Sequence, residues 1–495
     1  MAIKLIVASF ATLASEAKAG DTSHLLNSID TVFSQFAQTV FKILFFSIGG
    51  MPLIVLWLIS GAIFFTFRMR FVNIWAFWHA IEVVLGKYDN VEEEGEVSHF
   101  QALSTALSAT VGLGNIAGVA IAISLGGPGA SFWMTLGGLF GMTSKFVECT
   151  LAQKYRVVKP DGTISGGPMY YLSVGLAEVG NKQLGKFLAC MFSVLCVIGA
   201  IGGICLFQAN QSYAALSAVV PLFVERSWLY GLLLAFFVGL VIVGGIQRIG
   251  VVAATIVPSL CIVYVLVACW ILVLNFSAIP AAVATIVREA FSPEAVEGGF
   301  IGVMVQGLRR STFSNEAGIG SAAIAHSAAR TSEPVREGIV ALLEPFIDTV
   351  LICNMTALVV VITGAYNNPE FSQLSGAKLT SAAFGTVIDW FPLLLAVSVF
   401  FFAFSTLISW SYYGERSWDY LWGEKSLIIY KVLFLMAIFL GSVVSPASVI
   451  NLGDGILVAM AFPNLLGTYF LTGKVATDLE DYLHRLKLGK MTKSE

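Results

Sequence analysis

Two apolar stretches of the sequence are interrupted by glycine and by polar side chains in the same pattern. Residues 109–120 read ATVGLGNIAGVA, and residues 313–328 read FSNEAGIGSAAIAHSA. Each stretch has two glycines that stand two positions apart: Gly112 and Gly114 in the first, Gly318 and Gly320 in the second. Because each glycine weakens a helix by roughly 1 kcal/mol relative to alanine, such a pattern inside an apolar helix needs a physical reason.

A broken helix would allow these stretches to bind charged groups. The N-terminus of a half-helix presents free backbone N–H groups and a partial positive charge, which suit a carboxylate. The C-terminus of the other half and unwound carbonyl oxygens attract a small cation. A site with both ends suits a zwitterion such as an amino acid, together with a metal cation. The polar groups at hand are hydroxyls, amides and carbonyls, which favour Na+ over a transition metal.

Helix packing is the other interpretation of these glycines. Gly114 and Gly118 form a G-x-x-x-G pair, which lets two membrane helices approach closely. For one stretch alone this interpretation would be preferred. The repeated pattern favours the broken helix, because corresponding interrupted spans in two halves of a chain are a pointer to the binding site of secondary transporters.

The composition predicts an all-α integral membrane protein. The chain has 495 residues, of which 57% are hydrophobic and 12% charged, and its mean hydropathy is +0.83. The formal net charge is −3 and no basic stripe is present, so we expect no nucleic acid partner. The histidines lack metal-ligand spacing, and no Ser/His/Asp or H-E-x-x-H arrangement occurs, so we do not expect an enzyme.

The sequence predicts about 11 spanning helices, by the rule of roughly 20 apolar residues per span. They cover residues 51–67, 103–125, 132–151, 187–206, 230–244, 251–274, 300–325, 339–362, 391–410, 427–443 and 455–471. Residues 1–20 resemble a cleavable signal peptide, with a frayed or interfacial N-terminus as the alternative. Residues 21–98 would hold one extra span and a helix at 75–88 on the membrane surface.

The two interrupted spans each open a set of five. Residues 99–276 would form the first five-helix repeat and residues 299–474 the second, followed by a cytoplasmic tail at 475–495. Because each set crosses the bilayer an odd number of times, the two repeats would be inverted. Lys and Arg lie mostly in alternate loops, from Arg68 and Arg70 to Lys474, which predicts that this side is cytoplasmic and that the N-terminus is outside.

Longer blocks of the sequence resemble a known family. They read FQALSTALSATVGLGNIAGVAIAISLGGPGASFWM, GMTSKFVECTLAQKYR, SGGPMYY, FSNEAGIGSAAIAHSAA, AFSTLISWSYYGE and AFPNLLG. In this order, between residues 97 and 474, they are similar to signature blocks of the sodium:alanine (or glycine) symporter family, within the amino acid-polyamine-organocation superfamily. The resemblance implies a five-plus-five inverted-repeat fold of the leucine transporter type with one extra N-terminal span. It also implies sodium-coupled symport of alanine or glycine by alternating access in the cell (inner) membrane.

The resemblance further implies substrate-binding residues. In the first broken span these are Thr110, Gly112, Gly114 and Asn115, where Leu113 replaces the threonine of many family members and removes a hydroxyl. Elsewhere they are Gln208, Ser314, Asn315, Thr406 and Trp410.

The predicted sodium ligands are Gly112, Asn315, Ser405 and Thr406. Trp410 would limit the size of the substrate, and its alternative is a tryptophan at the membrane interface. For Gln208 the alternative is a helix-end amide that faces water. Glu316 is expected to bond to another helix.

Other buried charges are assigned structural roles. Lys145 and Glu148 stand three positions apart on one helix, which predicts an ion pair. Arg309 and Arg310 would form an outer gate with Asp454, or act as snorkelling anchors. Glu344, Asp348 and Asp389 are expected to serve helix packing or capping.

Two other function classes stay open at this point. A proton-coupled carrier or an exchanger would take up substrate without regard to Na+. A channel or a membrane enzyme would need a filter ring or a catalytic constellation, and the sequence shows neither.

Overall fold

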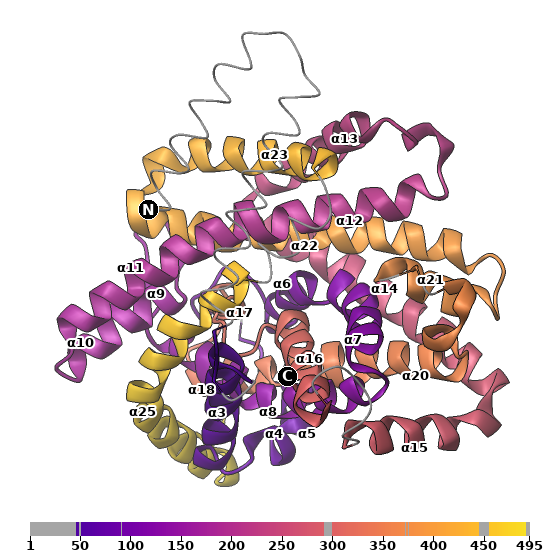
Figure 1. Cartoon of the computed structure of the whole chain (residues 1–495). Coiled ribbons are helices and arrows are strands. Elements are labelled where there is room, and N and C mark those ends of the chain that lie inside the picture. The colour runs from indigo at the N-terminus through magenta and orange to yellow at the C-terminus, as the bar shows by residue number, and fades with distance from the viewer. Residues whose placement is uncertain are drawn as a thin grey trace.

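The computed structural model describes residues 46–48, 51–90, 92–291, 299–371, 373–374, 376–444 and 455–491. The predicted signal peptide and Asp454 lie outside the described residues. Helices make up most of this part of the chain, which confirms the all-α prediction (Figure 1). Strands occur there as two short antiparallel pairs, β1 (Ser47–Ile48) with β2 (Met51–Pro52) and β3 (Val157–Val158) with β4 (Ile164–Ser165).

Each predicted span coincides with a helix or with successive helices. They are α3 (Leu53–Arg68), α6 (His99–Thr110) with α7 (Val119–Gly126), α8 (Gly129–Lys154), α11 (Lys182–Ile198) with α12 (Cys205–Ser217), α13 (Ser227–Ile242), α14 (Gly245–Leu274), α16 (Gly299–Asn315) with α17 (Ala322–His326), α18 (Pro334–Ala341) with α19 (Leu343–Pro345) and α20 (Asn354–Ile362), α22 (Phe391–Trp422), α23 (Leu427–Val443) and α25 (Ala461–Lys487). Among the described residues, six helices are long and apolar enough to cross a membrane, and up to seven if the bent α6–α7 pair is one span.

Several short helices lie between the spans. The predicted surface segment forms α4 (Val72–Trp75) and α5 (Phe77–Val84), on which Trp78 is 74% exposed. An exposed tryptophan of this kind suits the interface between lipid and water. Three further elements were not expected from the sequence: α15 (Ile279–Ala290), α21 (Ala377–Gly385) and the β3–β4 hairpin.

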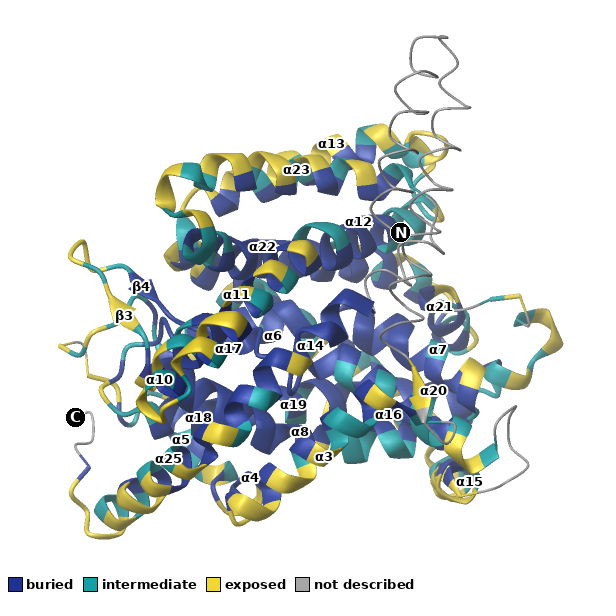
Figure 2. Ribbon diagram, turned by 60° about the vertical axis from the view of Figure 1, so that its left-hand side comes forward, coloured by how far each residue is buried: buried dark blue, intermediate teal, exposed yellow. Residues whose placement is uncertain are grey.

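α8 packs against several helices in the lower half of the molecule (Figure 1). α8 contacts α16, α18 and α3, while α6 contacts α14 and α22. Glycine allows close contacts here, because a Cβ atom on Gly137 would stand 2.6 Å from the Ser311 hydroxyl and one on Gly141 would stand 2.8 Å from Ala317. α13 and α23 pack on each other along one side, with exposed faces turned outward (Figure 2). Those faces carry Phe236, Phe237, Leu433 and Met436, which suits contact with lipid.

One end of the bundle is tied together by buried charges. The imidazoles of His99 on α6 and His326 on α17 each bond through Nδ1 to one oxygen of Glu337 on α18, the His326 contact at 2.5 Å. All three side chains are buried. The Arg330 N–H donates to the Val97 carbonyl at 2.8 Å beside them. Glu337 therefore holds the N-terminus of α6 next to the C-terminus of α17.

Two cations of the predicted cytoplasmic loops lie at the same part of α25. Arg70 pairs with Glu480 at 2.8 Å, and Lys154 pairs with Asp478 at 2.6 Å, so both reach the C-terminal half of α25. These pairs are partly or largely exposed, and each contributes little to stability.

Candidate substrate and ion site

The first predicted break is present in the structure. α6 ends at Thr110, because Val111 has extended backbone angles of φ −73° and ψ 111°. The chain turns back into a helix through the π-helical turn Gly114–Gly118, and the two halves meet at 49°. The side chain of Asn115 stabilises the bend, because its Oδ1 accepts a hydrogen bond from the Gly112 N–H at 2.7 Å.

Two glycines of this break make room for other segments. A Cβ atom on Gly112 would lie 3.3 Å from the Thr406 hydroxyl, and one on Gly114 would lie 3.3 Å from the backbone of Ser314. Both distances are tighter than ordinary van der Waals contact. Gly118 has no described atom within 4 Å of the same position. The packing interpretation therefore fails for Gly118, and the close approach is confined to the break.

The second predicted break is also present. α16 ends at Asn315, and three of the next five residues adopt left-handed backbone angles, namely Glu316 (φ 56°), Gly318 (φ 88°) and Gly320 (φ 89°). A left-handed Glu316 is strained, and its neighbours stabilise it. Its carboxylate accepts a hydrogen bond from the Trp410 indole N–H at 3.1 Å and another from the Ser321 hydroxyl. The expectation that Glu316 binds another helix is thus confirmed.

One hydroxyl and one carbonyl of α22 face the first broken span, whereas the Ser405 hydroxyl bonds within α22, to the Phe402 carbonyl at 2.9 Å. The Thr406 hydroxyl donates to the Ser108 carbonyl at 2.9 Å, and the Ser108 hydroxyl donates to the Ser405 carbonyl at 2.6 Å. The predicted sodium ligands Gly112, Ser405 and Thr406 are thereby brought to one place. Neutral oxygen atoms of this kind are suitable ligands for a hard monovalent cation.

A buried carboxylate lies where the two breaks meet. Asp348, in the π-helical turn Phe346–Cys353, accepts hydrogen bonds from the Ser314 hydroxyl at 2.8 Å and the Thr349 hydroxyl at 2.7 Å. The Asn115 amide also donates to its carboxylate, and to its backbone carbonyl at 3.0 Å. The ion pairs of the described chain do not include Asp348. The sequence prediction treated it as a packing or capping residue, although a carboxylate within an apolar span was the signal that could have identified it.

Asn315 lies beside this carboxylate, to which Thr349 links it. Its amide N–H donates to the Ser311 hydroxyl at 3.1 Å and the Thr349 hydroxyl at 3.0 Å. Thr349 thus connects Asn315 to Asp348. Among the predicted sodium ligands, Asn315 belongs to the polar group around Asp348, and Asn115 links that group to Gly112.

The other predicted substrate residues are buried. The Thr110 hydroxyl donates within its own helix, to the Ala106 carbonyl at 3.2 Å. Trp410 is fully buried, so it is not an interfacial residue. Gln208 is 5% exposed within α12, and its side-chain oxygen has no partner in the described part of the chain. A buried, unpaired amide oxygen contradicts the interpretation of a helix end that faces water.

The predicted ion pair between Lys145 and Glu148 is wrong. The Lys145 ammonium instead pairs with Glu344 on α19 at 2.8 Å, and the Asn464 amide donates to Glu148 at 2.7 Å. The i, i+3 spacing places two side chains on one face of a helix, but a partner from a neighbouring helix lies closer. Glu344 is therefore a charge partner across two helices, and not merely a packing residue.

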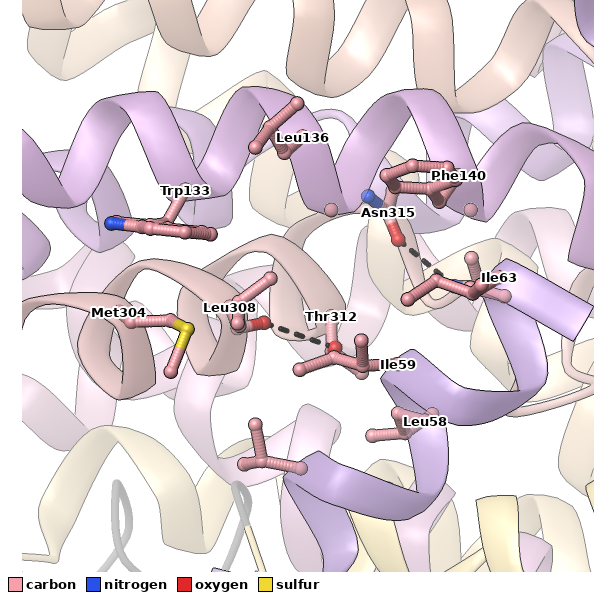
Figure 3. Close-up of a pocket in the computed structure, with 15 residues that line it drawn as sticks. Leu58, Ile59, Ile63, Trp133, Leu136, Phe140, Met304, Leu308, Thr312 and Asn315 are labelled. Atoms are coloured by element: carbon pink, nitrogen blue, oxygen red, sulfur yellow. Dashed lines mark hydrogen bonds between the residues drawn. The ribbon is translucent and has the colours of Figure 1, made fainter. Parts of the chain in front are cut away.

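An apolar cavity of about 130 Å³ lies next to the second break, between α3, α8 and α16 (Figure 3). Its walls are hydrocarbon and aromatic side chains such as Leu58, Trp133, Phe140 and Met304. Asn315 stands at its edge, with its amide oxygen bonded to the Ala317 N–H at 3.0 Å. The cavity offers few polar groups for a zwitterion, so it is not the candidate substrate site.

Comparison with known proteins agrees with this geometry. The model of the sodium:alanine symporter family matches residues 33–495. The chain belongs to the sodium:alanine symporter family. Similar members are the sodium/alanine symporter AgcS of Methanococcus maripaludis, 40% identical over 87% of this chain and 94% of that one, and the probable sodium/glutamine symporter GlnT of Bacillus subtilis, 37% identical over 88% and 89%. A third is the putative sodium/proton-dependent alanine carrier protein YrbD of Bacillus subtilis, 35% identical over 88% and 90%.

A solved structure shows the same fold. The structure of MhsT in complex with L-phenylalanine is similar with a TM-score of 0.55 at 13% identity, over 76% of this chain and 88% of that one. This likeness and the breaks confirm the leucine-transporter-type architecture of this member of the sodium:alanine symporter family. Its members are transporters, and membership supports cation-coupled transport of an amino acid across a membrane.

Proposed function

We propose that the protein is a sodium-coupled symporter of a small neutral amino acid, alanine or glycine, that works by alternating access. The observation that carries the proposal is the meeting of two broken spans at Gly114 and Ser314, with the Thr406 hydroxyl beside Gly112. Both breaks free backbone groups in the interior of a membrane protein, where such groups need a partner. A zwitterion with its coupling cation supplies partners of both signs.

The substrate would lie between the breaks. Backbone groups of Thr110, Gly112 and Gly114 and the amide of Asn115 would meet its carboxylate, while Ser314, Asn315 and Thr406 line the opposite side. Gln208 would offer its unpaired side-chain oxygen to the substrate ammonium. The indole of Trp410, fixed by Glu316, would limit the substrate side chain to a small size.

Sodium would bind at Gly112, Ser405 and Thr406, with Asn315 in the neighbouring polar group. We add Asp348 to this assignment. It is a buried carboxylate whose donors are an amide and hydroxyls, and Asn115 and Ser314 link it to both breaks. A sodium ion between these residues and the substrate carboxylate, together with the substrate ammonium, would balance the two negative charges in a dry site.

The proposed setting is the cell (inner) membrane, with the N-terminus outside and the C-terminus in the cytoplasm. The gathering of Arg70 and Lys154 at the C-terminal half of α25 supports this orientation. We also propose the division into an extra segment at 21–98 and inverted repeats at 99–276 and 299–474. Two matching breaks, in α6–α7 and α16–α17, support that division.

A proton-coupled carrier is the second candidate. The printed name of one relative, YrbD, includes both sodium and proton dependence. The two candidates differ in what drives accumulation, because a proton-coupled carrier responds to acid outside and is indifferent to Na+.

Uptake into proteoliposomes tests the proposal. An inward Na+ gradient is expected to drive accumulation of labelled alanine or glycine, and Thr406→Val and Gly112→Leu are expected to abolish it in folded protein. Thr363→Val is the matched control, because the Thr363 hydroxyl donates only within its own helix, at 2.8 Å to the Val359 carbonyl. Unchanged uptake in sodium-free buffer would contradict sodium coupling.

A further inference from the structure

A cluster of four charged side chains is buried behind the second break. It comprises Lys145 and Glu148 of α8, Glu344 of α19 and Glu316, each no more than 2% exposed. Lys145 and Glu344 form an ion pair at 2.8 Å and neutralise each other. Glu148 and Glu316 are left as two surplus carboxyl groups in the membrane interior. Two uncompensated negative charges at this depth would be very unfavourable, since buried charges need a partner of opposite sign.

The two surplus carboxyl groups differ in their hydrogen bonds. Both oxygens of Glu316 accept one, from Trp410 and from Ser321. Only one oxygen of Glu148 does so, from the Asn464 amide at 2.7 Å. The other oxygen, Oε2, is buried and has no partner among the residues that the structure describes. A carboxylate ion with an empty oxygen is the less favourable of the two charged groups.

Asn464 connects Glu148 to the second break. The same amide nitrogen that donates to Glu148 also donates to the Gly318 carbonyl at 2.9 Å, and Gly318 lies in the unwound segment after α16. The amide oxygen of Asn464 accepts a hydrogen bond from the Tyr171 hydroxyl. Asn464 belongs to the AFPNLLG block of α25. Movement of the unwound segment would therefore change the surroundings of Glu148 directly.

Several titratable groups face Glu148 from the elements packed around it. The charged ones are Lys145 on its own helix and Glu344 on α19, which also face Glu316; the others are Cys149 and Tyr171. The nearest opposite charge is Lys145, which is already paired with Glu344. The described residues thus supply no second cation for Glu148.

We propose that Glu148 is a proton-binding site, which carries a proton on Oε2 in the conformation seen here and exchanges it when the second break moves. Binding forms one O–H bond with a proton taken from water, and release returns that proton to water. The cluster then holds one surplus negative charge instead of two. A metal ion is less suited, because no group of three or more His, Cys, Asp or Glu side chains in the described chain could hold one.

Infrared difference spectroscopy of the purified protein tests this site without substrate. A protonated carboxylic acid has a C=O stretching band that a carboxylate lacks. We expect such a band at neutral pH, its loss in strongly alkaline buffer, and its absence from Glu148→Gln. Glu148→Asp retains a carboxyl group and should shift the band without removing it. Because the measurement does not involve transport, it can succeed or fail independently of the proposed function.

The control is Glu370→Gln, which changes an exposed carboxyl group and should leave the band unchanged. A spectrum of Glu148→Gln identical to that of the unmodified protein would show that Glu148 is ionised and would overturn the proposal. A band that disappears when Na+ replaces choline at constant pH would assign the site to sodium, and would likewise overturn it. A lost band in Glu148→Gln, with the band of Glu370→Gln unchanged and that of Glu148→Asp shifted, would support it.

Discussion

At the scale of single residues, the breaks depend on the absence of a side chain at glycine. Gly114 lies against the backbone of Ser314, which cannot move aside as a flexible side chain can. Gly112 lies against a hydroxyl, the Thr406 Oγ1. The pattern that first marked these stretches in the sequence therefore has a direct steric reason, at two of the three glycines of the first break.

Gly114→Ala is expected to lower uptake by tenfold or more. Its Cβ atom would lie 3.3 Å from the Ser314 Cα atom and would push the two breaks apart. Gly118→Ala is the matched control, because no described atom lies within 4 Å of its Cβ position, and it should transport normally. Initial rates in proteoliposomes measure both variants. Equal rates for the two would show that the contact between the breaks does not matter.

Asp348→Asn is expected to weaken sodium binding. The amide has nearly the shape of the carboxylate but lacks its charge, so the Na+ concentration for half-maximal uptake should rise at least about tenfold, or ~1.4 kcal/mol. Asp389→Asn changes an exposed carboxylate and serves as the control. An unaltered Na+ dependence of Asp348→Asn would remove Asp348 from the ion site.

At the scale of elements, α8 organises the interior through both small and charged residues. Gly137 and Gly141 bring it close to α16, and Lys145 links it to α19. Both side chains of the Lys145–Glu344 pair are 0% exposed, so each charge depends strongly on the other for its stability in the interior.

Lys145→Met is expected to destabilise the protein by about 3–5 kcal/mol, because Glu344 would lose its partner inside the protein. The double variant Lys145→Met/Glu344→Leu should recover much of that stability, since neither charge is then buried alone. Thermal unfolding in detergent measures both. If Lys145→Met alone is as stable as the unmodified protein, the ion pair does not stabilise the fold.

The contact of α5 with α25 should depend on pH. His79 on α5 lies 2.8 Å from the Tyr482 hydroxyl, and burial lowers the pKa of His79 below its usual value of 6.5. His79 of the unfolded chain then takes up a proton near that pH, while His79 of the folded chain does not. The contribution of His79 to the free energy of unfolding is therefore present above about pH 6.5 and is lost as the pH falls. Unfolding temperatures should therefore drop on acidification more for the unmodified protein than for His79→Gln. A parallel drop in both would contradict this.

Local patterns in the sequence predicted much of the fold, and long-range partners were missed. The glycine spacing located both breaks, and apolar runs located the spans, because both signals lie within one segment. Lys145 was paired with Glu148, three residues away, whereas its partner Glu344 is distant in the sequence. Asp348 was missed for the same reason, since its donors Asn115 and Ser314 come from two other spans.

At the scale of the whole molecule, binding of substrate and ion should stabilise the fold jointly. Alanine or glycine is expected to raise the unfolding temperature in Na+ buffer and not in choline buffer, and at about 100 times the dissociation constant the gain would be ~2.7 kcal/mol. Phenylalanine should have little effect, because Trp410 limits the pocket. Scanning fluorimetry across a panel of amino acids measures this. Equal stabilisation without Na+ would argue that substrate and sodium bind independently.

The pairing of His99 and His326 with Glu337 affects how the molecule can change shape. One carboxylate serves both broken spans, so neither can retreat from the other at that end without losing a charge-assisted bond in a site that excludes water. Any motion that separates the two broken spans at this end must therefore release at least one of the two imidazoles from Glu337.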